Sequence, residues 1–567
     1  MKFFSLPFVL FLIFILGFNF EILAQPCVGG NATETLDAAN SNIVLSSSGI
    51  WAFDNNENIP AYGWPKTTSG SVHKPGVLFT GNLWMSGFDE GLNLKFSGKT
   101  YGLDDFNGYW PGPLNEDGTT TTSDCINWDR LFKVNGVEID NFKSDFADNQ
   151  QLDDPVPMSI LGWPGKGNLS FSSIHGFELP DADPGLAPFF DRNGDGVYNP
   201  LMGDYPEVKC ADQAVWWVFN DVGNINFTGS DPVRMEIQMM AYVYSSNLDN
   251  VNNASFYDVK TIYRGNSPLD SFYMGIWLDP DLGCSFDDYI GYSIEEDLAY
   301  VYNQDNLDGL DDGTCLGDDS YNEPPMLGLK ILRKPFDDFG DELEVSSFLL
   351  YGGFGAEPPI INPTFAYPGE FYHLLSGSKD DGSPLLNPSG EITKFLFSDS
   401  PDDPDGWSMC SSEIENNDYR LLLSIGPNHI NNGETNEMTF AIVVQPQSEL
   451  PCPDITDLVN AADLPVPFRF SNFYCNLTVN TNEEDLNKIN LNVFPNPTSN
   501  QLNFQLFGVD HFLIIHLYQM DGQLVKEIEN FQTTTTTILT EDLVAGTYIY
   551  HIQTRNGKSI SGKIVLE

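Results

Sequence analysis

Hydrophobic and polar residues alternate along much of the chain with the two-residue period of a β-strand. The clearest example is 235–244, where the alternation is that of a half-buried strand. Similar runs, bounded by turn residues, lie at 77–84, 214–219, 256–263, 272–278, 347–351 and 438–444. No long run has helical periodicity, and only 454–462 indicates a short helix. The pattern therefore predicts an all-β, multi-domain protein.

The strand runs fall into several predicted domains, as expected for a chain of 567 residues. A turn-rich stretch at 180–203 separates two expected β-sandwich-like units with long acidic loops, 25–185 and 186–479. A polar linker is predicted at 480–490. Seven further strands are predicted at 491–494, 501–507, 512–518, 523–528, 533–539, 547–552 and 559–566. So many short strands in so few residues predict an Ig-like β-sandwich at 491–567.

The N-terminus has the features of an export signal. Lys2 precedes an apolar run from Phe3 to Phe20, and Ala24 supplies the small residue of a cleavage site. We therefore expect residues 1–24 to be a signal peptide. The alternative is a membrane anchor, but the run is marginal for about 30 Å of hydrocarbon. No later stretch reaches spanning length, so we expect a mature chain that does not span a membrane.

Export changes the interpretation of the cysteines, because disulfides form in oxidising compartments. All eight follow the predicted cleavage site, and none are arranged as CxxC, which disfavours a zinc site. Sequence alone leaves the pairing open. We predict one pair, Cys284 with Cys315, because each lies beside an acidic loop; buried free thiols are the alternative at some positions.

The charge of the chain excludes some partners. With 26 Lys and Arg against 80 Asp and Glu, the net charge is −54. Nucleic acids require clustered cations, so we expect no nucleic-acid partner. Anionic membrane surfaces are disfavoured for the same reason.

The last 80 or so residues carry ordered motifs: 492–498 (Asn-Val-Phe-Pro-Asn-Pro-Thr), Leu517-Tyr518 with Asp521-Gly522, 545–548 (Ala-Gly-Thr-Tyr) and 563–566 (Lys-Ile-Val-Leu). In these motifs, residues 487–567 resemble the type A C-terminal sorting domain of the type IX secretion system. The resemblance implies a Bacteroidetes protein that crosses the periplasm and reaches the outer surface or the medium. It also implies the secretion machinery as a partner. A second set of motifs includes 110–113 (Trp-Pro-Gly-Pro), 203–206 (Gly-Asp-Tyr-Pro) and 277–281 (Trp-Leu-Asp-Pro-Asp). In these motifs, residues 83–289 resemble a group of large secreted Bacteroidetes proteins, which implies location and no mechanism.

The strongest chemical motif is 191–198 (Asp-Arg-Asn-Gly-Asp-Gly-Val-Tyr), the first half of an EF-hand-like calcium loop. The expected oxygen ligands are Asp191, Asn193, Asp195 and the carbonyl of Val197. The bidentate Glu of a full loop is missing, so Asp204 or Asp183 would complete the set. An Asx-rich turn without an ion is the alternative.

A second acidic cluster follows the apolar strand at 272–278. It contains Asp279, Asp281, Asp287 and Asp288. Carboxylates this close repel one another unless a cation or water screens them. We therefore expect a second calcium site here.

Catalytic motifs are absent from the sequence: it has no GxSxG, HExxH, P-loop or correctly placed GxGxxG. Two hypotheses remain. The first is a non-catalytic surface or matrix protein, stabilised by calcium and disulfides, that acts in adhesion or binding. The second is a secreted polysaccharide-active hydrolase. An extracellular polysaccharide or surface ligand is an expected partner in either case.

Overall fold

In the computed structural model, residues 27–463 are described apart from 55–58, 67–74, 100–107, 353–358 and gaps of up to four residues, and residues 490–566 apart from several inter-strand loops. The predicted signal peptide at 1–24 and linker at 480–490 lie outside the described residues, except for Asn490. Asp183 also lies outside them.

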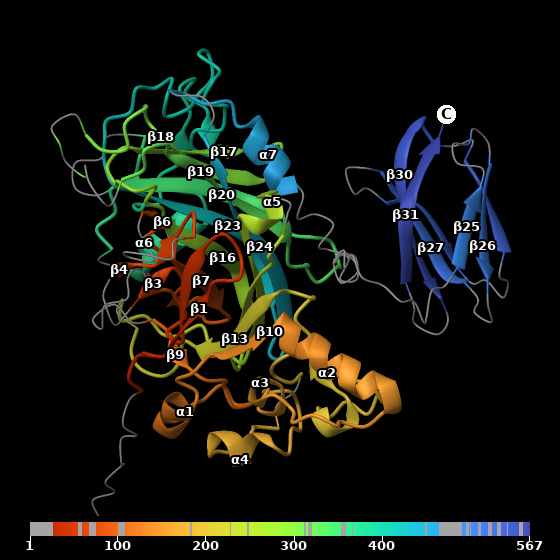
Figure 1. Cartoon of the computed structure of the whole chain (residues 1–567). Coiled ribbons are helices and arrows are strands. Elements are labelled where there is room, and N and C mark those ends of the chain that lie inside the picture. Colours follow the sequence, from red (N-terminus) through yellow and green to blue (C-terminus); the bar gives the residue numbers. More distant parts are fainter. Residues whose placement is uncertain are drawn as a thin grey trace, which may run out of the picture.

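The chain is mostly β-structure in several antiparallel sheets, which confirms the predicted fold class (Figure 1). The largest sheet has nine strands. They are β10 (Phe132–Asn135), β13 (Gln213–Asn220), β14 (Met235–Val243), β15 (Ala254–Tyr263), β24 (Thr435–Pro446), β19 (Pro325–Arg333), β18 (Leu298–Asn303) and β17 (Asp288–Ser293) in that order, with β9 (Trp110–Pro111) beside β13.

A second sheet of five strands brings together the segments that matter for the site. Its order is β20 (Val345–Gly352), β23 (Tyr419–Ile430), β16 (Leu269–Asp279), β7 (Thr80–Asp89) and β8 (Leu94–Ser97). A four-stranded sheet contains β1 (Thr33–Leu36), β2 (Asn42–Ser46), β5 (Tyr62–Gly63) and β6 (Gly76–Leu78). Two-residue strands form three small ribbons: β3 (Phe53–Asp54) with β4 (Ile59–Pro60), β11 (Phe189–Phe190) with β12 (Tyr205–Pro206), and β21 (Leu385–Leu386) with β22 (Ile392–Thr393).

The sheets share one hydrophobic core that runs from Leu36 to Ala462. Within it, Trp84 of β7 stacks on Trp277 of β16, with ring centroids 6.0 Å apart. Strands from 25–185 and from 186–479 pair within the same sheets. The predicted division near residue 185 thus falls inside a connected core, and as a folding boundary it stays a prediction.

Short helices lie around the sheets. They are α1 (Thr122–Asn127), α2 (Gly136–Asn149), α3 (Met158–Leu161), α4 (Phe171–His175), α5 (Asp249–Asn252), α6 (Pro368–Leu375) and α7 (Thr456–Asp463), with a 3₁₀ turn at Pro200–Met202. The helix α7 confirms the prediction at 454–462. The 14-residue helix α2 was not predicted, although Ile139, Phe142 and Phe146 recur on its buried face at helical spacing.

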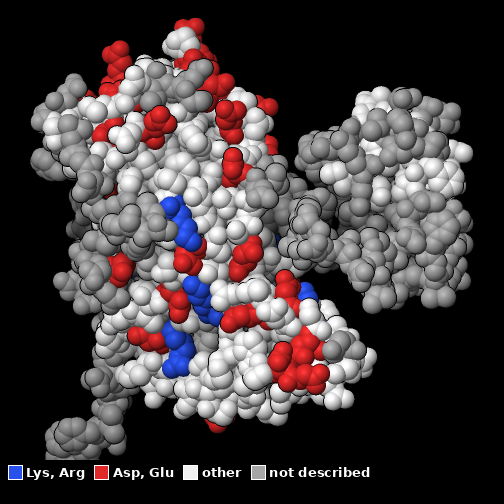
Figure 2. Space-filling model, viewed as in Figure 1, with Lys and Arg blue, Asp and Glu red and all other residues white. Residues whose placement is uncertain are grey.

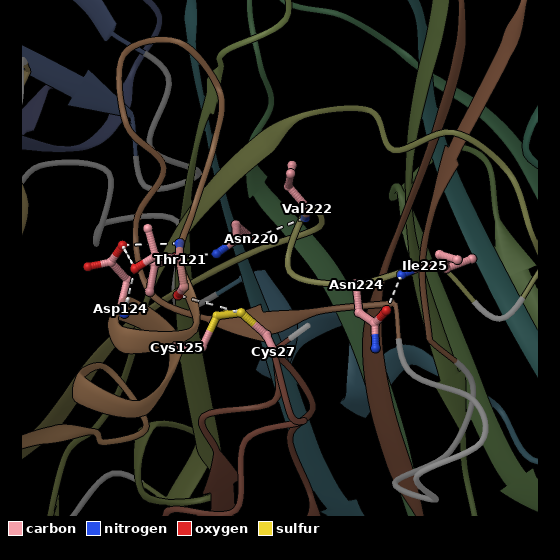
Figure 3. The surroundings of a disulfide bond; sticks show 9 residues. Cys27, Thr121, Asp124, Cys125, Asn220, Val222, Asn224 and Ile225 are labelled. Carbon is pink, nitrogen blue, oxygen red and sulfur yellow. Dashed lines mark hydrogen bonds between the residues drawn. A yellow bond between two sulfur atoms is a disulfide. The ribbon is translucent and has the colours of Figure 1, made fainter. Parts of the chain in front are cut away.

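The first disulfide fastens the start of the described chain to α1. Cys27 is bonded to Cys125 (Figure 3). The Cys27 amide also donates to the carbonyl of Gly223 at 2.9 Å. The helix begins in a capping box, because Thr121 Oγ1 accepts from the Asp124 amide while Asp124 Oδ2 accepts from the Thr121 amide. Disulfides also join Cys284 to Cys315, as predicted, and Cys410 to Cys452.

The C-terminal segment forms a seven-stranded unit with its own core. Its strands are β25 (Asn490–Phe494), β26 (Gln501–Phe507), β27 (Phe512–Gln519), β28 (Leu524–Glu529), β29 (Thr535–Leu539), β30 (Gly546–Thr554) and β31 (Ser559–Leu566). They form a three-stranded and a four-stranded sheet. Leu502, Phe504 and Ile552 are fully buried in the core of this unit.

Candidate metal centre

Three aspartates meet at one end of the five-stranded sheet. Asp279 is the last residue of β16, Asp281 lies in the turn that follows, and Asp418 directly precedes β23. Because β16 and β23 are paired, with Leu278 opposite Leu421, the end of one strand adjoins the start of the other. One oxygen from each of the three carboxylates lies within 4.8 Å of the other two.

One basic side chain partly balances this charge. Arg420 Nε lies 3.0 Å from Asp279 Oδ1, and its Nη2 lies 2.6 Å from Asp418 Oδ2. A single guanidinium against three carboxylates leaves excess negative charge in a buried place. The Oδ1 atoms of Asp281 and Asp418 are buried, and no hydrogen-bond donor among the described residues reaches them. The group is therefore rich in acceptors and poor in donors.

A second set of buried oxygens adjoins the first. Asp287 and Asp288 lie at the start of β17, and each uses one oxygen to accept a backbone amide: Gly309 N to Asp287 at 2.7 Å, and Leu282 N to Asp288 at 2.9 Å. The Oδ1 atom of each carboxylate is buried without a hydrogen-bond partner in the described structure. These oxygens, too, are acceptors held away from water.

Asn303 adds an amide oxygen to this set. It is the last residue of β18, is fully buried, and donates through Nδ2 to the carbonyls of Asp305 and Leu307. These two bonds fix the orientation of the amide, and its Oδ1 accepts from no described donor. The Asn303 side chain also hydrogen-bonds to Asp287, which lowers the pKa of that carboxyl and partly offsets the effect of its burial. The Asn303 amide oxygen is therefore one more buried acceptor beside the carboxylates.

Burial shifts the acidity of the whole cluster. It raises the pKa of Asp287 to about 6 and that of Asp308 to about 7, and the neighbouring carboxylates add to the rise. The pKa values of Asp281 and Asp288 are raised well above the ordinary range by burial, and next by Asp279 and Asp287 respectively. Burial thus disfavours the ionised forms of Asp281 and Asp288 most strongly, unless positive charge compensates them.

The Cys284–Cys315 disulfide lies beside this cluster. Asp308 Oδ1 accepts from the Cys284 amide at 2.8 Å, and its other oxygen accepts from the Tyr321 amide. Gly283 must be glycine here, because its φ is +83° and a Cβ would stand 2.1 Å from Asp308 Oδ2. The disulfide, the glycine turn and Asp308 therefore hold the loop against the carboxylates.

The donor set matches hard cations. All the converging atoms are carboxylate or amide oxygens, the ligands that calcium and magnesium take, while zinc and copper sites use His or Cys. Asp279, Asp281 and Asp418 are the one group of three or more His, Cys, Asp or Glu side chains with convergent ligand atoms in the described part of the chain. This group could hold a metal ion.

The first predicted loop has a different geometry. The Asp191 oxygens accept from the amides of Gly194 and Gly196, both at 2.7 Å, which lowers the pKa of Asp191. Asn193 Oδ1 accepts from the Asp195 amide, and Asp195 Oδ1 accepts from the Val197 amide at 2.8 Å. The loop is therefore held in shape by hydrogen bonds from its own backbone amides to its own side-chain oxygens.

Asp204 closes the base of that loop. It is fully buried and accepts from the Arg192 amide at 2.9 Å and the Asn199 amide at 2.8 Å. Both oxygens therefore have partners in the backbone. Calcium binding by Asp191, Asn193, Asp195, Val197 and Asp204 stays a prediction.

The structure adds ligand candidates that the sequence analysis did not include. Asp418 and Asn303 lie far along the chain from Asp279, and only strand pairing brings them to the cluster. The Asp418-Tyr-Arg420 sequence before an apolar run was the one available signal, since it places an acid and a base at a strand start.

Acidic side chains outnumber basic ones on the face in Figure 2, where the few Lys and Arg lie mostly in its middle. Exposed tryptophans could stack on a sugar ring, but Trp110, Trp128, Trp216, Trp217 and Trp277 are buried, and Trp407 is partly buried against the core. No helix in the described ranges is long and apolar enough to span a membrane.

Comparison with known families identifies the C-terminal unit. Residues 492–567 match the family described as the secretion system C-terminal sorting domain. These residues are a type IX sorting domain. The sorting domain directs the protein to the cell surface or the extracellular space and implies recognition by the type IX machinery. The resemblance found in the sequence motifs is thereby confirmed.

No curated protein matches the chain. Among solved structures, a polysaccharide lyase matches with a TM-score of 0.16 and 7% identity, over 58% of this chain. The chain covers only 34% of the length of that lyase. The BSP domain of a biofilm-associated protein matches with a TM-score of 0.13 and 8% identity, over 66% of this chain and 67% of that one. Dimeric latent PorU from Porphyromonas gingivalis matches with a TM-score of 0.12 and 9% identity, over 62% of this chain and 31% of that one. TM-scores this low assign neither fold nor activity.

Proposed function

We propose that this protein is a non-catalytic surface or matrix protein with an adhesion or binding role, exported by the type IX system and stabilised by calcium. The observation that carries the proposal is the buried group of Asp279, Asp281 and Asp418. The three carboxylates converge where two paired strands of the core meet, and the Oδ1 atoms of Asp281 and Asp418 have no described donor, so an ion there would act on the stability of the whole fold.

Calcium fits this group better than the alternatives. The ligands are oxygens on turns, and calcium accepts six to eight such ligands in flexible geometry, whereas magnesium demands a near-ideal octahedron. Asp287, Asp288 and Asn303 supply further buried oxygens beside the first three. We assign Asp279, Asp281 and Asp418 to one ion, with Asp287 and Asp288 available to a neighbouring one.

The exposed loop at 191–197 is the second proposed calcium site. Its support is the ligand spacing together with the left-handed φ of +76° at Gly196, the position at which calcium loops of this type turn sharply. An ion at this site would bind more weakly than at the buried one, since solvent competes for its ligands. Removing it should leave the core intact.

The polysaccharide hydrolase is the second candidate, and it has less support. Glycosidases place two carboxyl groups about 5–10 Å apart across a bond that the substrate must reach. Of the convergent carboxylates here, Asp279 is buried, Asp281 and Asp418 are partly buried, and two of the three contact Arg420. An ion-holding role fits that environment better than attack on a bulky substrate.

The test of function uses the mature exported protein with calcium present. It should be retained on insoluble polysaccharide or on cell surfaces, and it should release no reducing ends and no unsaturated products from soluble polysaccharides. Steady release of either product by the purified protein, lost in an Asp281→Asn variant, would overturn the non-catalytic assignment. Deleting 492–567 should leave the remainder folded in the periplasm; normal secretion of that truncated form would contradict the export route.

A further inference from the structure

A cavity lies against one face of the nine-stranded sheet, away from the metal centre. Its volume is about 450 Å³, within the range of small-molecule sites. Gln238, Lys260 and Glu437 stand side by side in its floor, because Gln238 pairs with Lys260 and Lys260 with Glu437. Two residues further along the strands, Asp258 pairs with Thr439. Residues two apart share a face of a strand, so these rows form one polar surface.

The segment Pro184–Phe189 forms a wall of the cavity. It is fastened to the floor, because Gln238 Nε2 donates to the Gly185 carbonyl at 3.1 Å, and to the core, because Trp163 Nε1 donates to the Pro188 carbonyl at 2.9 Å. Gly185 has a φ of +100°, which a residue with a side chain adopts only with strain. The wall is thus held in a defined position over the sheet.

Donors and acceptors alternate around this cavity. Lys209 Nζ lies 3.0 Å from Asp258 Oδ2, and Thr439 Oγ1 donates to Asp258 Oδ1 at 2.8 Å. At the rim, Arg333 Nη1 lies 2.5 Å from Glu437 Oε2, and both side chains are almost half exposed. Four of the 26 Lys and Arg residues line this one cavity, together with three acids. Its charge balance is therefore unlike that of the chain.

This mixture selects the chemistry of the ligand. A strongly anionic ligand would face Glu207, Asp258 and Glu437 within a chain of charge −54, and a cationic ligand would face four basic side chains. An apolar ligand would remove water from these charged and polar groups without offering them hydrogen bonds in return. A hydroxyl both donates and accepts hydrogen bonds, so a ligand with many neighbouring hydroxyls matches alternating donors and acceptors.

We infer that this cavity binds a neutral saccharide unit. The inference rests on the proposed binding function and names its ligand class. Arg333 and Glu437 contact the sugar at the rim, while Asp258, held by Lys209 and Thr439, accepts from its hydroxyls.

The experiment is calorimetric titration of the mature protein in calcium. The probes are neutral oligosaccharides of glucose, mannose, galactose, xylose and N-acetylglucosamine, with a galacturonate and a sulfated oligosaccharide as charged arms. The variant is R333Q/E437Q, which removes one exposed ion pair without changing net charge. The control is D270N/H429Q, an exposed pair at 2.6 Å on the other large sheet.

At least one neutral probe should bind, at least tenfold more weakly to R333Q/E437Q and equally to the control. No binding by any neutral probe, or equal binding by R333Q/E437Q, would overturn the inference. Binding of the charged probes alone, abolished by salt, would also overturn it. A negative result here would not bear on the proposed calcium sites, which are tested separately by whether a chelator lowers the melting temperature. The saccharide inference and the calcium proposal can therefore be judged separately.

Discussion

Replacing Asp281 by Asn should have opposite consequences with and without calcium. With the ion bound, the substitution removes a charged ligand from the group of three aspartates. Without the ion, the same substitution removes a carboxyl group whose ionised form is costly to bury, since Asp281 Oδ1 has no described donor and burial raises the pKa of Asp281 well above the usual range. The two conditions therefore separate a ligand from a merely structural aspartate.

The size of the effect follows from linkage. An ion at a hundred times its Kd stabilises the native state by about 2.7 kcal/mol. If the substitution weakens binding about a hundredfold, the variant retains only about 0.4 kcal/mol of that term. The loss of about 2 kcal/mol corresponds to roughly 5 °C in Tm for domains of 150–250 residues, and to somewhat less for a larger core.

Thermal melts in calcium and in excess chelator measure this difference. Wild type should lose several degrees on chelation, whereas Asp281→Asn should change little and should melt at or above wild type in chelator. Glu90→Gln, at an exposed turn position, is the matched control and should follow wild type in both conditions. A wild-type melt that ignores chelator, or a variant equally destabilised in both conditions, would refute the reasoning.

Three further predictions concern stability. Replacing Cys284 and Cys315 together by Ser should cost about 3–4 kcal/mol by chain entropy, since the bond closes a loop with a sequence separation of 31; an unchanged denaturant midpoint would contradict this. Asp221→Ala should cost about 2–4 kcal/mol in urea unfolding, because the buried amides of Arg234 and Met235 lose their acceptor, while Asp221→Asn should cost less. Asp270 raises the pKa of the partly exposed His429, so their ion pair stabilises the fold below about pH 6.5, and this contribution is lost as the pH rises through the raised pKa. His429→Asn should therefore flatten the pH dependence of the free energy of unfolding by a few tenths of a kcal/mol. An unchanged pH dependence would count against this prediction.

Local patterns specify much of this fold. The seven strands of the sorting domain begin and end within two residues of their predicted limits, since each is a short alternating run between turn residues. The Cys284–Cys315 bond was predicted for a weaker reason, the acidic loops around both cysteines. The helix α2 was missed because its apolar residues are widely spaced among acids.

The candidate site depended on information that local patterns lack. Asp279, Asp281, Asp287 and Asp288 are close in sequence and were grouped for that reason. The structure instead divides them, and pairs Asp279 and Asp281 with Asp418 across the β16–β23 register. Long-range strand pairing decides which carboxylates converge, and no short window of sequence encodes it.

The most direct test of the central claim is anomalous diffraction from crystals of the mature protein grown in calcium. An anomalous peak is predicted between Asp279, Asp281 and Asp418, with oxygen ligands at about 2.3–2.6 Å. Carboxyl groups that share protons or waters there, with no anomalous peak, would contradict the claim that a cation holds this part of the core.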